Sequence, residues 1–124
     1  MSQEIRNLEP KVLWNKFADL NAVPRPSKKE DRVIAFMKDF GESLGLETFE
    51  DDIRNVIIRK PATPGMEDRK AIVMQGHLDM VHQKNGDTVF DFDTQGIDMY
   101  VDADWVRARG TTLGADNGCN YGGT

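Results

Sequence analysis

Hydrophobic residues recur at helical spacing over the first part of the chain. Between residues 10 and 20 the apolar side chains fall on one stripe of a helix, and Pro10 suits a first helical turn. Two prolines in residues 23–26 then interrupt the periodicity, because proline favours extended backbone. The pattern predicts a first helix over residues 10–20, followed by an extended break.

The pattern predicts a second helix from residue 28 to residue 44. Apolar residues again follow helical spacing there, and Gly45 suits the end of a helix. Ser27 and Glu30 stand three residues apart before the apolar run, which is the spacing of a capping box. In that motif each side chain bonds the backbone N–H of the other residue.

The pattern changes to strand periodicity after the second helix. Strands are predicted at residues 46–50, 55–60 and 71–75, and two short strands at residues 99–101 and 105–108. The segment 71–75 is predicted to be a buried strand, because its apolar run is β-branched in the middle and is followed by glycine. Helices and strands in this order indicate an α/β fold with a mixed sheet.

Residues 81–96 are polar and rich in aspartate. Both a calcium-binding loop and a solvated surface loop contain such residues. The stretch lacks the EF-hand order, with glycine at the sixth position and glutamate at the twelfth, which favours the solvated loop. His82, in the same stretch, is interpreted as a solvated loop residue.

Composition narrows the class of protein. The chain has 124 residues, 39% of them hydrophobic and 30% charged, which is typical of one soluble globular domain. Its net charge of −5 does not indicate binding to nucleic acid. No basic cluster or long apolar run indicates contact with a membrane. A single cysteine, Cys119, and no signal peptide lead us to expect a cytoplasmic location.

His77 and Asp79 follow the predicted buried strand. Side chains two residues apart on extended backbone point the same way. An imidazole can bind a divalent metal through one nitrogen while a carboxylate accepts a hydrogen bond from the other, which fixes the tautomer. The alternative is a strand-end histidine bonded to a backbone carbonyl, with Asp79 as an ordinary turn residue. The short spacing leaves both interpretations open.

Asp116 lies in residues 110–118, a stretch dense in turn-forming residues. One interpretation is a plain surface turn, because Asp-Asn-Gly tolerates positive φ. The other is a metal ligand on a glycine-rich bend that lets the backbone approach the site. Taken alone, the stretch does not decide between them.

The two stretches together resemble a known family. Gly-His-Leu-Asp-Met at residues 76–80, followed by Gly-Thr-Thr-Leu-Gly-Ala-Asp-Asn-Gly at 110–118, resembles the aminoacyl-histidine dipeptidases, also called cytosol non-specific dipeptidases. These belong to the carnosinase-like co-catalytic zinc metallopeptidases. Val-Pro-Arg-Pro-Ser at 23–27 and Asp-Trp-Val at 104–106 also fit. The resemblance therefore extends from about residue 13 to residue 118.

The resemblance implies a role for each matched residue. His77 matches a histidine that binds one zinc ion, and Asp79 matches the catalytic-site aspartate that orients this histidine. Asp116 matches the carboxylate that bridges two zinc ions, and the peptide bond after it is cis in the family. The implied cofactor is a pair of Zn²⁺ ions, with Mn²⁺ or Co²⁺ possible, which activate water to hydrolyse Xaa-His and other dipeptides.

The resemblance also implies what the chain lacks. The family places its catalytic glutamate and further ligands beyond the bridging aspartate, and residues 119–124 do not match the helix expected there. We therefore expect residues 1–124 to be the N-terminal portion of the catalytic, metal-binding domain, an incomplete zinc-exopeptidase-like α/β/α sandwich without a second domain. Alone it is expected to be inactive and to self-associate through exposed sheet edges.

Two other interpretations remain open at this point. The first is a non-catalytic α/β module in which His77 and Asp79 are structural. The second is an assembly fragment that needs a partner chain to complete its metal site. Metal affinity that depends on His77 would argue against the first, and co-purification with a partner would support the second.

Overall fold

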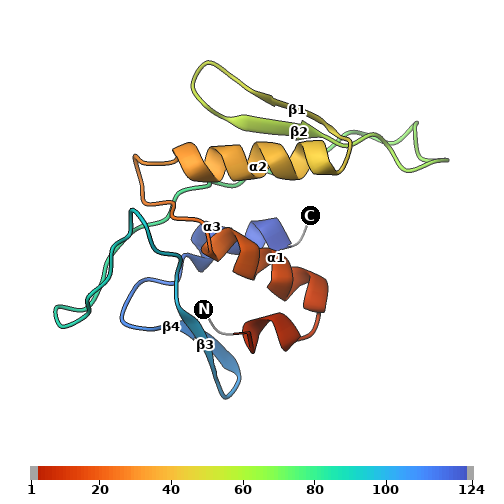
Figure 1. Cartoon of the computed structure of the whole chain (residues 1–124). Helices are drawn as coiled ribbons and strands as arrows, with labels where there is room; N and C mark the ends of the chain where they lie inside the picture. Colours follow the sequence, from red (N-terminus) through yellow and green to blue (C-terminus); the bar gives the residue numbers. More distant parts are fainter. Residues whose placement is uncertain (1–2, 123–124) are drawn as a thin grey trace. The chain divides into compact units, whose positions relative to one another are not determined.

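A computed structural model describes residues 3–122, and Figure 1 labels their helices and strands. The elements in chain order are η1 (Ile5–Asn7), α1 (Lys11–Asn21), α2 (Asp31–Ser43), β1 (Glu47–Glu50), β2 (Val56–Arg59), β3 (Met99–Asp102), β4 (Trp105–Ala108) and α3 (Ala115–Gly122). The α/β class is confirmed. None of the helices within residues 3–122 combines the length and the apolar character that crossing a membrane requires.

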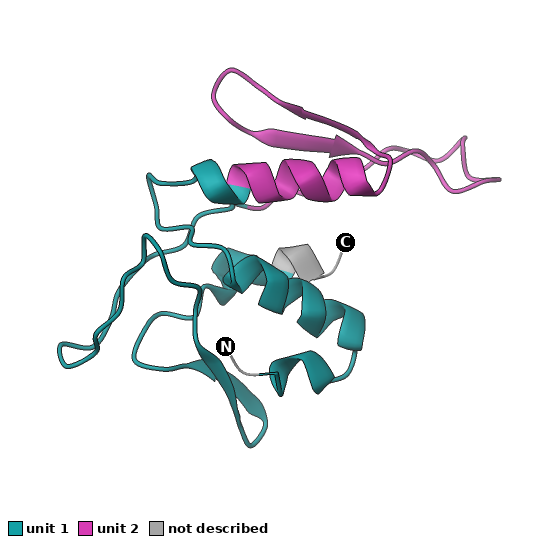
Figure 2. Ribbon diagram, in the orientation of Figure 1, with its two compact units in different colours: residues 1–33, 77–124 teal, residues 34–76 magenta. Residues whose placement is uncertain are grey.

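The chain divides into two compact units, coloured separately in Figure 2. The larger unit joins Met1–Val33 to His77–Thr124, and the smaller unit comprises Ile34–Gly76. All three candidate site residues belong to the larger unit.

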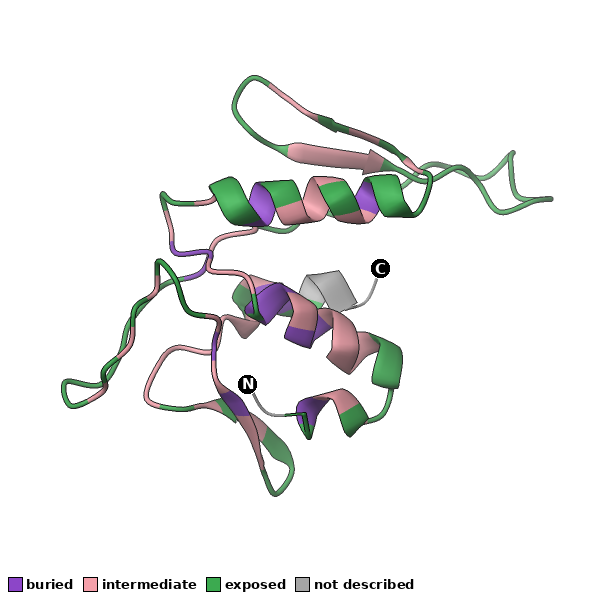
Figure 3. Ribbon diagram, in the orientation of Figure 1, coloured by how far each residue is buried: buried purple, intermediate pink, exposed green. Residues whose placement is uncertain are grey.

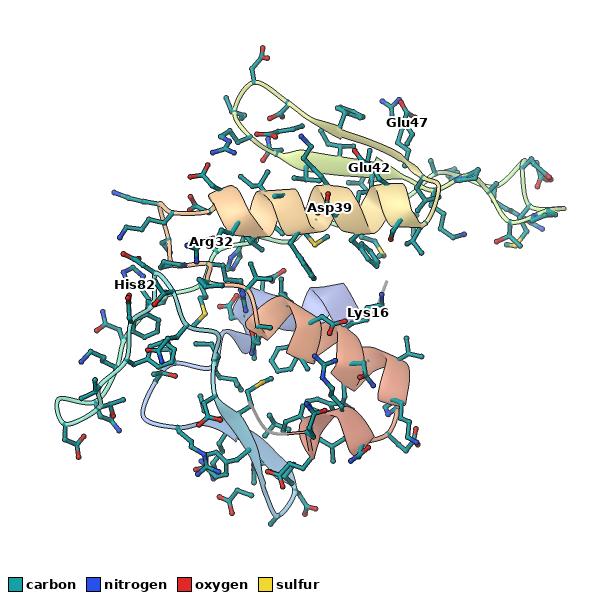
Figure 4. The ribbon with its side chains drawn as sticks, viewed as in Figure 1. Lys16, Arg32, Asp39, Glu42, Glu47 and His82 are labelled. Carbon is teal, nitrogen blue, oxygen red and sulfur yellow. The ribbon has the colours of Figure 1, made fainter. Side chains whose placement is uncertain are left out.

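The smaller unit packs α2 against the β1–β2 hairpin. The two strands lie where the sequence predicted strands, and they pair antiparallel. Gly41 allows close packing, because a Cβ atom there would meet the Thr48 hydroxyl and the Ile58 side chain. A salt bridge of 3.3 Å between Lys38 Nζ and Glu50 Oε2 also connects the helix to β1. Asp39 and Glu42, labelled in Figure 4, lie on the exposed surface of the helix.

The larger unit contains η1, α1, α3 and the antiparallel β3–β4 hairpin. Its core is formed by six buried residues: Ile5, Phe17, Ala18, Met80, Ile97 and Met99. Figure 3 shows the buried positions along α1, which presents its apolar stripe to this core. The first helix and the β3–β4 hairpin confirm the sequence prediction.

The predicted buried strand over residues 71–75 is wrong. These residues belong to no strand, and Ile72, Val73 and Met74 expose 81%, 93% and 66% of their surface. A strand needs neighbours that pair with its N–H and C=O groups. Within residues 3–122 the strands form two separate two-stranded antiparallel sheets in place of the expected mixed sheet.

The predicted capping box is also wrong. The helix begins at Asp31 instead of residue 28. The Glu30 carboxylate accepts a hydrogen bond of 2.6 Å from the Lys28 N–H, and Lys28 has a φ of +73°. The Ser27 hydroxyl donates instead to the Asp79 carboxylate, which is a stronger acceptor than a backbone group.

The loop over residues 81–96 is consistent with the solvated interpretation. The Asp91 carboxylate accepts hydrogen bonds from its own turn, namely from the Asp93 N–H and the Thr94 hydroxyl. His82, labelled in Figure 4, is exposed and contacts the Phe92 ring edge-on at 5.7 Å between ring centroids.

Candidate metal centre

His77 lies between two carboxylates. Its Nδ1 atom is 3.0 Å from Asp79 Oδ1, and its Nε2 atom is 3.0 Å from Asp116 Oδ1. The imidazole remains open to solvent, with half of the side-chain surface exposed. The structure therefore brings together all three residues that the sequence singled out, although Asp116 follows His77 by 39 positions.

Two carboxylates beside one imidazole favour the protonated ring. A neutral imidazole carries one N–H and can donate to one carboxylate, whereas the imidazolium ion donates to both. The pKa of His77 is accordingly raised above its usual value of 6.5, chiefly by the hydrogen bond with Asp116, while partial burial acts in the opposite direction. Since a metal ion binds neutral imidazole, it would replace the Nε2 proton.

Asp79 is held by a partner that the sequence analysis missed. The Ser27 hydroxyl donates a hydrogen bond of 2.5 Å to Asp79 Oδ2, while Oδ1 faces His77. The bond from Ser27 is the main cause of the lowered pKa of Asp79. Asp79 therefore stays ionised, accepts from His77 Nδ1 and directs Nε2 toward Asp116.

Backbone pairing places Ser27 beside Asp79. Pro26 forms a parallel bridge with Met80, whose N–H donates to the Arg25 carbonyl at 3.0 Å. The Ser27 N–H in turn donates to the Met80 carbonyl at 3.2 Å. The prolines in this segment indicated extended backbone, but nothing in the local pattern indicated its partner.

Asp116 lies on a bend at the start of α3. Gly114 has a φ of +78°, a conformation that favours glycine, and its carbonyl accepts a hydrogen bond of 3.1 Å from the Gly118 N–H. The peptide bond between Asp116 and Asn117 is cis, as the family resemblance predicted. The Asp116 side chain is 93% exposed, so its carboxylate is accessible to a ligand.

The two candidate ligand atoms, His77 Nε2 and Asp116 Oδ1, are of the kinds that bind zinc. Imidazole nitrogen and carboxylate oxygen are common zinc ligands, and Mn²⁺ and Co²⁺ accept the same atoms. Catalytic zinc sites use about three protein ligands per ion. Among the described residues, no three His, Cys, Asp or Glu side chains are arranged to hold a metal ion. Asp79 does not add a third ligand, because it faces the opposite ring nitrogen of His77.

One contact of His77 also fits the alternative interpretation, in which the histidine is structural and bonds a backbone carbonyl. Its Nδ1 atom lies 2.9 Å from the Asp79 backbone carbonyl, as expected of a histidine that is only structural. The same nitrogen therefore has a backbone and a carboxylate acceptor available. Neither contact involves Nε2, which faces Asp116.

The chain is similar to solved and curated dipeptidases, although no protein-family model matches it. It is 49% identical over 115 residues to the cytosol non-specific dipeptidase of Escherichia coli (strain K12), a match that covers 93% of this chain and 24% of that protein. A crystal structure of the aminoacylhistidine dipeptidase from Vibrio alginolyticus matches 97% of this chain and 24% of its own, with 45% identity and a TM-score of 0.93. The chain thus spans about a quarter of the length of these relatives. In sequence and in fold, the chain is therefore similar to one segment of these dipeptidases, in line with the resemblance that its motifs indicated.

Proposed function

We propose that the chain supplies part of the metal site of a dipeptidase. His77 and Asp116 act as ligands of a divalent metal ion, and Asp79 orients His77. Zn²⁺ suits these donor atoms best, and Mn²⁺ or Co²⁺ can take its place. Such an ion, when bound, polarises a peptide carbonyl and activates water for hydrolysis. The proposed substrates are dipeptides, Xaa-His dipeptides among them, and the proposed location is the cytoplasm.

The observation that carries the proposal is the meeting of His77 Nε2 and Asp116 Oδ1, 3.0 Å apart. A single metal ion between these two atoms would need only a small widening of the gap, since zinc binds nitrogen and oxygen at about 2 Å. Asp79 on the opposite ring nitrogen supplies the outer partner that metal-bound histidines usually have. The two related proteins, both named as dipeptidases, support the reaction class.

The test is a titration with Zn²⁺ by calorimetry, comparing the native chain with His77→Ala. The proposal predicts saturable binding by the native chain and at least a ~10-fold loss of affinity in the variant, because one of two ligand atoms is removed. His82→Ala is the matched control, since His82 is the other histidine of the chain and is exposed. Equal zinc affinity in the native chain and His77→Ala would contradict the proposal.

The second candidate is a non-catalytic module with a structural His77, favoured by the 2.9 Å contact between Nδ1 and the Asp79 carbonyl. The same titration separates the two candidates. A structural histidine predicts that His77→Ala lowers the melting temperature without changing the affinity for zinc, whereas a ligand predicts a loss of zinc affinity.

Hydrolysis requires more groups than this pair. We propose that the remaining ligands and a general base come from other residues of a complete enzyme or from a partner chain. Pure residues 1–124 are then expected not to hydrolyse β-alanyl-histidine. Hydrolysis by the pure chain that a chelator abolishes would contradict this expectation, and activity restored by adding a separate chain would support the assembly interpretation.

A further inference from the structure

Arg25 is a buried cation that contacts both segments of the candidate metal centre. It is among the most buried residues of the described part of the chain, with 1% of its surface exposed. One terminal nitrogen, Nη1, donates to the Leu78 carbonyl at 3.1 Å, and the other, Nη2, donates to the Gly114 carbonyl at 2.9 Å. Leu78 stands between His77 and Asp79, and Gly114 stands two residues before Asp116.

We propose that Arg25 is the positioning residue of the metal centre, holding the His77 segment and the Asp116 segment at the spacing that brings Nε2 and Oδ1 together. The inference rests on the proposed function where it concerns the metal ion. The positioning of the two protein segments can be tested without a metal. Arg25 touches no ligand atom and acts through the backbone of each segment.

The geometry of a guanidinium group suits this role. Its two terminal nitrogens project from one rigid plane, so a single side chain can bond carbonyls of two segments at fixed separation. The backbone of Arg25 already pairs with the His77 segment, because its carbonyl accepts from the Met80 N–H. The side chain extends this connection to the bend that carries Asp116.

The glycines around Asp116 make room for the guanidinium group. A Cβ atom at Gly114 would lie 2.6 Å from Arg25 Nη2, and a Cβ atom at Gly118 would lie 3.2 Å from it. Both positions therefore need the close approach that glycine permits. The glycine-rich bend therefore packs directly against the Arg25 guanidinium group.

Asn21 holds the guanidinium group in place. Its Oδ1 atom accepts from Arg25 Nη2 at 2.7 Å, and its Nδ2 atom donates to the Leu113 carbonyl at 3.0 Å. Burial lowers the pKa of Arg25 to about 10, which still leaves the group charged at neutral pH. A buried charge is costly unless it is hydrogen-bonded, so the position of the group is tightly constrained.

The first experiment measures the coupling of the two segments without metal. Nitrogen-15 NMR shifts of the His77 imidazole are recorded at one fixed pH in the native chain and in Asp116→Asn, then again with Arg25→Lys in both. We expect Asp116→Asn to shift the His77 nitrogens strongly in the native background and much less in Arg25→Lys, because a lysine ammonium donates from a single nitrogen and lacks the two rigidly separated terminal nitrogens that bond the two carbonyls. Equal shifts in both backgrounds would overturn the proposal.

The second experiment uses Co²⁺ alone as the probe. We expect Arg25→Lys to weaken Co²⁺ binding, followed by its visible absorption, by ~10-fold, as for other outer partners of metal ligands. Arg6→Lys is the matched control, because Arg6 bonds Asn15 and Asp19 and neither ligand segment. In the His77→Ala background, Arg25→Lys should cause little further loss. If Arg25→Lys only destabilised the fold, it would lower the melting temperature but leave the effect of Asp116→Asn on the His77 nitrogen shifts unchanged in the folded fraction. That result would overturn the proposal.

Gly118→Ala keeps the proposal testable if Arg25→Lys fails to fold. It retains the arginine, and its Cβ atom would lie 3.2 Å from Nη2 and 3.0 Å from Phe17 Cε2, so it crowds the guanidinium group together with the Phe17 ring. The NMR coupling should again fall, and undiminished coupling would overturn the proposal. The two proposals fail separately. A native chain that binds no Co²⁺ but loses its coupling in Arg25→Lys would refute the metal function and support the positioning role.

Discussion

At the scale of single residues, His77 makes the candidate site sensitive to pH. A carboxylate oxygen lies 3.0 Å from each of its ring nitrogens, and only the imidazolium ion donates to both. The folded state therefore binds this proton more tightly than the unfolded state does. By linkage, the resulting contribution to stability is present below the unfolded value of 6.5 and is lost as the pH rises through the raised pKa of His77.

We expect the pKa of His77 to lie above 6.5 in the native chain and to fall toward that value in Asp116→Asn, which removes the charged acceptor from Nε2. The measurement is an NMR titration of the imidazole ring protons. The ring protons of His82 serve as an internal reference, since the Asp116 substitution should not move them. A His77 titration curve that is the same in the native chain and in Asp116→Asn would contradict the contact.

The site could be predicted in part from residue types and spacing. His77, Asp79 and Asp116 were identified because imidazole and carboxylates in a known motif order indicate metal chemistry. Ser27 was missed because its partner, Asp79, lies 52 positions away, whereas its nearest pattern matched a capping box. Arg25 was missed for the same reason, since its acceptors in the two site segments are backbone carbonyls, which leave no trace in side-chain type.

At the scale of elements, the bend before α3 determines where Asp116 stands. Gly114 combines a φ of +78° with close contacts to Arg25 Nη2 and Met80 Sδ, which a Cβ atom would meet at 2.6 and 2.9 Å. Gly45, at the end of α2, has a φ of +70° and open space around it. The two glycines thus share a backbone conformation and differ in crowding.

We expect Gly114→Ala to destabilise the chain more than Gly45→Ala does. Each substitution places alanine in the left-handed region, at a cost of about 1–2 kcal/mol. Crowding at Gly114 should add about 1–3 kcal/mol, as for other overpacked sites. The measurement is urea unfolding followed by far-UV circular dichroism. Equal losses of unfolding free energy in the two variants would mean that the contacts with Arg25 and Met80 relax without cost.

Helices and strands could be predicted from the sequence where their contacts are made between nearby residues. Helices α1 and α2 and the strands of both hairpins form between residues close in sequence, so periodicity and turn residues predicted them, whereas η1 and α3 were not predicted. The segment 71–75 carries an equally clear apolar run, yet a buried strand also needs distant neighbours. Its composition could indicate the preference for a strand but could not supply the pairing partners.

At the scale of the whole molecule, residues 71–75 leave an apolar stretch open to solvent. Ile72, Val73 and Met74 are consecutive and all exposed, and they belong to no strand. Such a stretch has high strand propensity, low charge and backbone groups able to pair with another chain. Another exposed valine, Val89, lies in the polar loop over residues 81–96, where Phe90 is its only apolar direct neighbour.

We therefore expect the native chain to self-associate in a concentration-dependent manner and Val73→Lys to reduce this association. A lysine in the middle of the run places a charge where a second strand would pack, which is how natural edge strands avoid pairing. Val89→Lys adds the same charge at an exposed valine outside the run, so net charge alone should not reproduce the effect. Sedimentation velocity over a range of concentrations measures the outcome. A single monomeric boundary for the native chain at every concentration, with cooperative melting, would show that the exposed run does not drive association. An equal reduction by both substitutions would attribute the association to overall charge instead of to this stretch.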